Sequence, residues 1–183
     1  MITTVDTVLH PSEDMAFVFF RTAITQEPSE SGSSCWLCED WLSLALYTKG
    51  AGGWMMMKFD KWFAKQGVYD RTAKPELVEA GRIGKAVLVI SSDGEPEHSS
   101  TTHHLFGVPG LREALSIATE VYEVERGGPD GPMGEPVNSE YRFIPSDKDW
   151  YDVEVEEAGA KPVRWVYSSA TGKYVPATKA PAR

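Results

Sequence analysis

The 183-residue chain is poor in cysteine and has no long apolar run. Its two cysteines, Cys35 and Cys38, exclude the disulfide framework of a small secreted domain. No stretch approaches the roughly 20 apolar residues that cross a bilayer, and residues 1–14 lack the basic start and hydrophobic core of a signal peptide. We therefore expect a cytoplasmic protein that makes no membrane contact.

Basic residues are also scarce relative to acidic ones. The chain has 18 lysines and arginines against 27 aspartates and glutamates, a net charge of −9. A general nucleic-acid binder needs a basic patch that captures phosphates, so we expect no direct nucleic-acid binding. The sequence also lacks a Walker phosphate loop, a dinucleotide-binding glycine pattern, an H-E-x-x-H zinc motif, an EF-hand loop and a G-x-S-x-G nucleophile turn. No familiar catalytic motif therefore points to an enzyme.

What the chain does contain is typical of a folded globular protein, with 42% hydrophobic and 25% charged residues. The patterns predict an α+β fold, in which a mixed sheet core with about three helices precedes a C-terminal antiparallel β-meander. We expect an α/β core at residues 1–126, a Gly/Pro-rich linker or long loop at 127–137, an acidic meander packed on the core at 138–178, and a frayed tail at 179–183.

The core is predicted around a strand, a histidine-rich loop and a helix. The apolar run Ala86–Ile90 is typical of a strand covered on both faces, as is Met15–Ile24. Three- and four-residue spacing predicts the main helix after Pro109 and Gly110, with apolar positions at Leu111, Ala114, Leu115, Ala118, Val121 and Tyr122. Further helices are predicted within residues 35–47, 60–66 and 75–80. Met55, Met56 and Met57 are interpreted as flexible core filling, with a promiscuous binding surface as the alternative.

Cys35 and Cys38 form a C-x-x-C pattern with three interpretations. A redox pair at a helix start is disfavoured by Glu39 and Asp40, because nearby negative charge opposes the thiolate. A zinc site needs two more ligands, which the histidine-rich loop could supply, although some sixty residues separate the two halves. Its predicted ligands are Cys35, Cys38, His103 and His104, with His98 as a substitute. The simplest interpretation is two small buried residues on a helix.

The loop from His98 to His104 could also serve hydrolysis, since imidazole titrates near neutral pH and Ser99 and Ser100 lie close by. Closeness in sequence is weak support for a catalytic triad, because geometry defines a triad. The alternative is a solvated polar loop.

Beyond residue 137 the hydrophobic pattern changes to period two. Alternation at residues 139–143, 153–155 and 163–167, with a last strand at 174–175, predicts an antiparallel meander. Carboxylates concentrate in this part of the chain, since residues 120–157 hold twelve of them against three basic residues. The excess of nine negative charges in this segment equals the net negative charge of the whole chain.

Asp152, Glu154 and Glu156 are predicted to project from one face of a strand at intervals of about 6.6 Å. Such a row can dock onto a basic surface by accelerating encounter and excluding wrong partners. Trp150 and Trp165 can supply aromatic anchors for this interface. The alternative is an ordinary sheet whose outward charges are solvated and partly offset by arginine across the hairpin.

The sequence thus predicts an acidic, non-enzymatic binding protein of the inhibitor, immunity or adaptor type, a role that fits small acidic proteins of mobile elements or toxin systems. Its partner would be a protein with a basic surface, and it would need no cofactor. The residues expected to carry binding are Asp149, Trp150, Asp152, Glu154, Glu156 and Trp165. The alternative function is a zinc-binding protein or metal-dependent hydrolase that uses Cys35, Cys38, His103 and His104.

Overall fold

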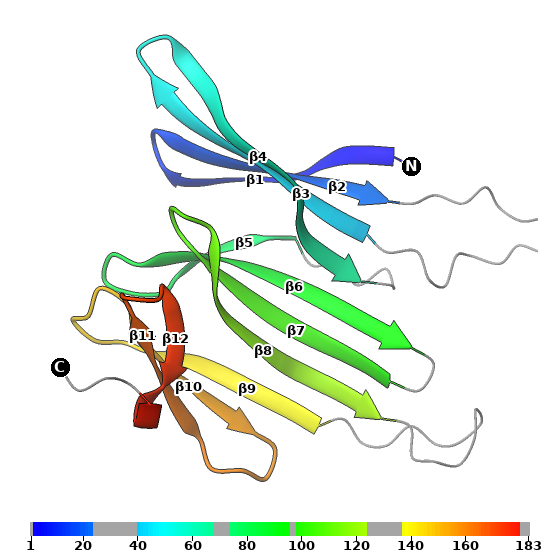
Figure 1. Ribbon diagram of the computed structural model, residues 1–183, viewed down its shortest axis with the longest axis vertical. Coiled ribbons are helices and arrows are strands. Elements are labelled where there is room, and N and C mark those ends of the chain that lie inside the picture. Colours follow the sequence, from blue (N-terminus) through cyan, green and yellow to red (C-terminus); the bar gives the residue numbers. More distant parts are fainter. Residues whose placement is uncertain (1, 24–39, 68–73, 96–97, 124–136, 180–183) are drawn as a thin grey trace, which may run out of the picture. The chain divides into compact units, whose positions relative to one another are not determined.

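In the computed structural model, the described part of the chain is built from strands and contains no α-helix (Figure 1). The structure describes residues 2–23, 40–67, 74–95, 98–123 and 137–179. The strands are β1 (Ile2–Ser12), β2 (Met15–Ala23), β3 (Asp40–Gly50), β4 (Gly53–Gly67), β5 (Glu76–Glu79), β6 (Lys85–Glu95), β7 (His98–Gly107), β8 (Arg112–Glu123), β9 (Val137–Ile144), β10 (Asp152–Glu157), β11 (Val163–Ser168) and β12 (Lys173–Pro176), followed by one 3-10 turn, η1 (Ala177–Lys179). The expected α+β class with three helices is therefore wrong.

The chain divides into two compact units. Unit 1 comprises residues 1–76 and 89–94, and unit 2 comprises residues 77–88 and 95–183. This division falls after the first residue of β5 and within β6, whereas the sequence placed a linker at 127–137. Strands β7 and β8 thus belong to the same unit as the acidic meander.

Unit 1 holds the antiparallel sheet β1-β2-β3-β4. The segment 89–94 of β6 pairs with the end of β4 through one parallel bridge. Residues 40–47 of the helix predicted at 35–47 lie in β3, and residues 35–39 lie outside the described residues. Leu42, Leu44 and Leu46 alternate at period two, which is the strand pattern that the helical interpretation overlooked.

The predicted helix at residues 60–66 is part of β4. Three residues of β4, from Lys61 to Phe63, lie opposite the single residue Ser43, because the register passes from Leu42–Ala64 to Leu44–Asp60. Such a bulge changes the phase of alternation along a strand. The bulge gives Phe59, Trp62 and Phe63 a spacing that imitates one face of a helix.

The main predicted helix, from residue 111 onward, is also a strand. In β8, Leu115 and Ile117 are buried while Ser116 and Ala118 are exposed, which is period-two alternation. A register irregularity between the Leu105–Leu115 and Phe106–Glu113 pairs leaves Ala114 as an extra residue. Ala114 is therefore buried next to Leu115, and this local change of phase produced the helical spacing.

Unit 2 contains β5, the start of β6, and the strands that follow in the order β7-β8-β9-β10-β11-β12. The predicted helix at residues 75–80 is the short strand β5, which pairs with β6. The predicted histidine loop is strand β7. The C-terminal meander lies where the sequence placed it, in β9 to β12. The buried core of unit 2 consists of Ala80, Ala86, Leu105, Ala114, Leu115, Ile117, Val153 and Tyr174.

Within the residues that the structure describes, no helix has the length and apolar character needed to span a bilayer.

Candidate functional site

The predicted acidic row begins at a buried carboxylate. Asp152 is only 3% exposed. Lys148 Nζ donates to both of its carboxylate oxygens at 2.8 Å, and Arg164 Nε donates to Oδ2 at 2.9 Å. Burial alone would raise the pKa of Asp152, but the hydrogen bonds and charges of Lys148 and Arg164 hold this pKa below its ordinary value. Asp152 therefore anchors its own loop and strand and does not face a partner.

The other two carboxylates of the row differ from each other. Glu154 forms an ion pair with Arg142, which lies opposite it on β9. Glu156 lies opposite Glu140, and both are exposed. Like charges directly opposite each other are destabilising, so repulsion acts at this end of the row. The three carboxylates share one face as predicted by alternation, but two of them are neutralised.

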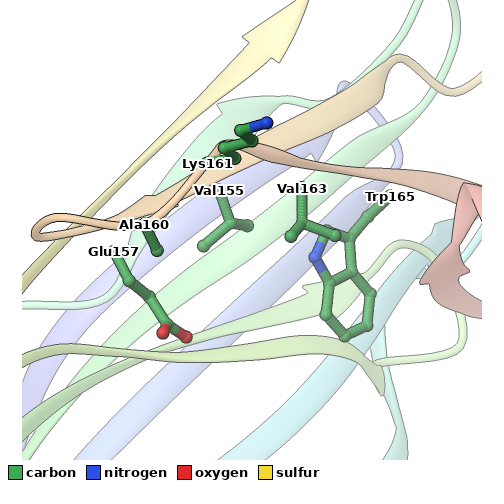
Figure 2. Close-up of a pocket in the computed structure, with 6 residues that line it drawn as sticks. All are labelled: Val155, Glu157, Ala160, Lys161, Val163 and Trp165. Atoms are coloured by element: carbon green, nitrogen blue, oxygen red, sulfur yellow. The ribbon is translucent and has the colours of Figure 1, made fainter.

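The predicted aromatic anchors pack within unit 2. The Trp150 ring stacks on Tyr167, with centroids 4.4 Å apart and planes 10° apart. Trp165 lines an open hollow of about 130 Å³ with Val155 and Val163, and Figure 2 shows these side chains side by side on β10 and β11. Such a hollow is smaller than the roughly 300 Å³ at which ligand pockets begin. The remaining predicted residue, Asp149, pairs with Arg82 at the surface.

The predicted histidine ligands do not converge. His103 and His104 are successive residues of β7, so their side chains leave opposite faces of the sheet. His103 Nδ1 lies 3.1 Å from the Tyr141 hydroxyl, and His104 Nδ1 lies 2.6 Å from Glu113 Oε1. The described residues contain no cluster of three or more potential metal ligands. The other two predicted zinc ligands, Cys35 and Cys38, lie outside the described residues.

The environment of His103 is that of a structural residue. Burial lowers the pKa of His103 below its ordinary value, and the negative charge of Glu120 offsets this only in part. The ring also contacts Tyr141 edge-on, with centroids 5.6 Å apart. Ser99 and Ser100, the nucleophiles considered for hydrolysis, are strand residues of β7 paired with β8. The Ser116 hydroxyl lies 3.3 Å from His104 Nδ1, but Glu113 contacts this same ring nitrogen, so the three groups do not have the alignment of a catalytic triad, in which the nucleophile and the acid contact opposite nitrogens.

A different surface stands out in unit 1, on one face of the sheet β1-β2-β3-β4. The strand register arranges the side chains of this face in rows that run across the strands. One row is Val8, Val18, Ala45 and Phe59, and the next is Val5, Phe20 and Ser43. A third row contains Ala16, Tyr47 and Met56. Its exposed large apolar residues are Val5, Val8, Trp54, Met56, Phe59 and Trp62. We call this surface the aromatic face, because Phe20 and Trp41 complete its set of rings.

Small residues on the middle strands let the larger rings meet above them. The Phe20 and Phe59 centroids lie 6.4 Å apart across β3, where Ala45 is buried. His10 of β1 and Trp54 of β4 reach each other at 6.0 Å, although two strands separate them. Neighbouring strands lie about 4.8 Å apart, so this contact requires the sheet to curl toward the aromatic face. The rings cover the small residues and leave their own outer sides in solvent.

The charge of the aromatic face differs from that of the chain as a whole. Lys49 Nζ lies 6.0 Å from the Trp54 ring centroid, and Lys61 Nζ lies 4.8 Å from that of Trp62, both within cation–π range. None of the described strand residues on this face is a carboxylate. The aromatic face is therefore both apolar and basic, on a chain whose net charge is −9.

The most exposed part of this surface is the end of the β3–β4 hairpin, residues 49–58, which we call the hairpin tip. Figure 1 shows the β3–β4 hairpin (cyan) extending beyond the neighbouring β1–β2 hairpin (blue). Four consecutive large apolar residues follow its turn, with exposed fractions of 45% for Trp54, 61% for Met55, 54% for Met56 and 56% for Met57. The structure thus places the three methionines at the surface and not in the core.

The hairpin tip was overlooked because an apolar run is ordinarily a sign of burial. One signal was available, namely the glycines Gly50, Gly52 and Gly53 immediately before the run. Glycines at that spacing favour a tight turn, and a run that starts at a turn lies at the end of a hairpin, where little structure can cover it. The chain matches no family model, curated protein or solved structure.

Proposed function

We propose that the chain is a cytoplasmic, non-enzymatic binding protein and that its binding element is the β3–β4 hairpin. The observation that carries this proposal is the exposed run of Trp54, Met55, Met56 and Met57. Soluble proteins rarely expose several large apolar residues in succession unless the surface binds something. Methionine is also well suited to binding, because its flexible, polarisable side chain adapts to the surface it meets.

Binding through the acidic meander remains a prediction, but fewer of its carboxylates are available to a partner than the sequence suggested. Of the carboxylates expected to contact a basic partner, Asp152 and Glu154 already have cationic partners. Glu156 and the opposing Glu140 are the members of that face that could still attract a basic surface. Their mutual repulsion would be relieved by such a partner. The hairpin has stronger support, because it combines apolar area with charge.

The binding proposal predicts that the methionines of the hairpin tip contribute little to folding. We expect the triple variant Met55→Ser, Met56→Ser, Met57→Ser to lose no more than about 1 kcal/mol of unfolding free energy in urea, since exposed side chains rarely matter to stability. The native wild type should bind an apolar fluorescent dye, and the triple variant should lose most of that signal.

A buried residue of the same unit provides the control. Phe17 is fully buried on β2, and Phe17→Ala should lose about 3–5 kcal/mol in the same assay. A comparable loss in the methionine variant would mean that these side chains form part of a core. The hairpin would then have no binding role.

A further inference from the structure

We propose that the hairpin tip binds the surface of an anionic lipid bilayer and inserts its apolar residues into the boundary between headgroups and acyl chains. This inference rests on the proposed function and names its partner. It also departs from the sequence-based expectation that the chain makes no membrane contact.

The first argument is that the hairpin tip is apolar on both faces of the sheet. Register pairs Met55 with Thr48 and Met56 with Tyr47, so the two methionines point to opposite faces. A flat protein surface could cover only one of these faces. A fluid interface surrounds the whole tip and removes Trp54, Met55, Met56 and Met57 from water together.

The second argument is the distribution of charge around the apolar run. Lys49 precedes it, Lys58 follows it, and the chain from Lys49 to Phe59 contains no carboxylate. Lysines at this position lie beside lipid headgroups when the apolar side chains are inserted, and Trp54 is of the residue type that prefers such an interface. Each lysine near an anionic leaflet strengthens partitioning roughly fivefold. The cytoplasmic leaflet carries the anionic lipids that this requires.

The neighbouring hairpin sets the orientation of insertion. The Lys49 backbone N–H donates to the Asp14 carbonyl at 2.8 Å, so the β1–β2 turn lies beside Lys49. Glu13 and Asp14 in that turn are exposed carboxylates, which an anionic surface repels. The methionines lie on β4, and β3 separates them from this turn, so the hairpin inserts with its β4 side toward the bilayer and the acidic turn stays in water.

Other partners fit the hairpin less well. Single-stranded nucleic acid stacks its bases on open ring faces, but the Trp41 and Trp62 rings contact each other edge-on and Lys61 covers Trp62. A second copy of the chain packed against the aromatic face would leave Met55 uncovered on the opposite face. A second copy is an alternative outcome of the experiment below.

The experiment is sedimentation of the full-length protein with vesicles of phosphatidylcholine alone or with 30% phosphatidylserine. We expect binding to the anionic vesicles, at least tenfold weaker binding to the neutral ones, and weakening by high salt. The triple methionine-to-serine variant should lose binding. The pair Lys49→Gln, Lys58→Gln should weaken it by roughly 25-fold, at about fivefold for each lysine.

Matched controls come from unit 2. Val163→Ser removes an exposed apolar residue, and the pair Lys161→Gln, Lys173→Gln removes two exposed lysines, so both variants should bind as the wild type does. Equal binding by the methionine variant and the wild type would overturn the lipid inference. So would a failure to bind anionic vesicles by protein that still binds the apolar dye, although the proposed function would then stand. A wild-type dimer in size-exclusion chromatography that the methionine variant abolishes would assign the tip to a second copy.

Discussion

Replacing Gly81 by alanine should cost on the order of 4 kcal/mol of unfolding free energy, through a backbone clash and the hydrogen bonds lost with it. A Cβ at residue 81 would lie 1.9 Å from the Asp149 carbonyl oxygen and 2.6 Å from the Trp150 Cα. These are backbone atoms, which cannot rotate away. This close contact between the two backbone segments is also where the loop before β10 is hydrogen-bonded to the β5–β6 turn. The Arg82 N–H donates to the Lys148 carbonyl at 3.0 Å, and the Tyr151 N–H donates to the Ala80 carbonyl at 2.7 Å.

Gly110 is the matched control for this substitution. It lies in the same unit, and a Cβ there would meet nothing within 4 Å. Urea unfolding should show Gly110→Ala close to the wild type and Gly81→Ala far less stable. Equal midpoints for the two variants would mean that the loop carrying Trp150 does not pack against residue 81.

The second large effect is expected when Asp152 loses both cations. The double variant Lys148→Ala, Arg164→Ala leaves an unpaired carboxylate that is almost fully buried, and breaking a buried pair in this way typically costs 3–5 kcal/mol. We expect about 3 kcal/mol at pH 7, because Lys148 and Arg164 are themselves about half exposed and water screens part of the interaction. Urea unfolding measures this loss.

The pH dependence should change sign in the double variant. In the wild type the pKa of Asp152 is held below its ordinary value, so its contribution to stability is present above about pH 4 and is lost as the pH falls through the lowered pKa. Without Lys148 and Arg164, burial alone acts and raises the pKa of Asp152. The folded variant then takes up a proton more readily than the unfolded chain, so its stability deficit should shrink as the pH is lowered from 7 toward 5.

Adding Asp152→Asn to the double variant is the control, because the amide carries no charge to bury. The triple variant should recover most of the stability at pH 7 and lose the reversed pH dependence. A double variant as stable as the wild type at pH 7 would show that the carboxylate is hydrated and that the acidic row is more open than its burial indicates.

The strands that could be predicted from sequence are those with an undisturbed local pattern. The unbroken apolar runs at 15–23 and 86–90 and the alternation through β9 to β12 each correspond to strands. Prediction failed where a bulge shifts the phase of the alternation. The extra residue at Ala114 and those opposite Ser43 turn a period of two into a spacing of three and four, which a sequence cannot distinguish from a helix.

The candidate site was harder to predict than the fold, because it depends on contacts between distant residues. Alternation placed Asp152, Glu154 and Glu156 on one face correctly, but the cations that neutralise Asp152 come from a loop and from another strand. The apolar run at Met55 was mispredicted in the opposite direction, as buried where it is exposed. Its composition is that of a core, and only the position of the hairpin shows that none of the described residues of unit 1 covers it.

The most direct measurement is the rate at which hydrogen peroxide oxidises each methionine of the native protein, followed by mass spectrometry. Oxidation of methionine follows its access to solvent. The exposure of Met55, Met56 and Met57 predicts that they oxidise nearly as fast in the native protein as in the urea-unfolded chain, and that anionic vesicles protect them. Oxidation of all three that is many times slower in the native protein without vesicles would contradict an open hairpin tip, and with it the binding role assigned to the β3–β4 hairpin.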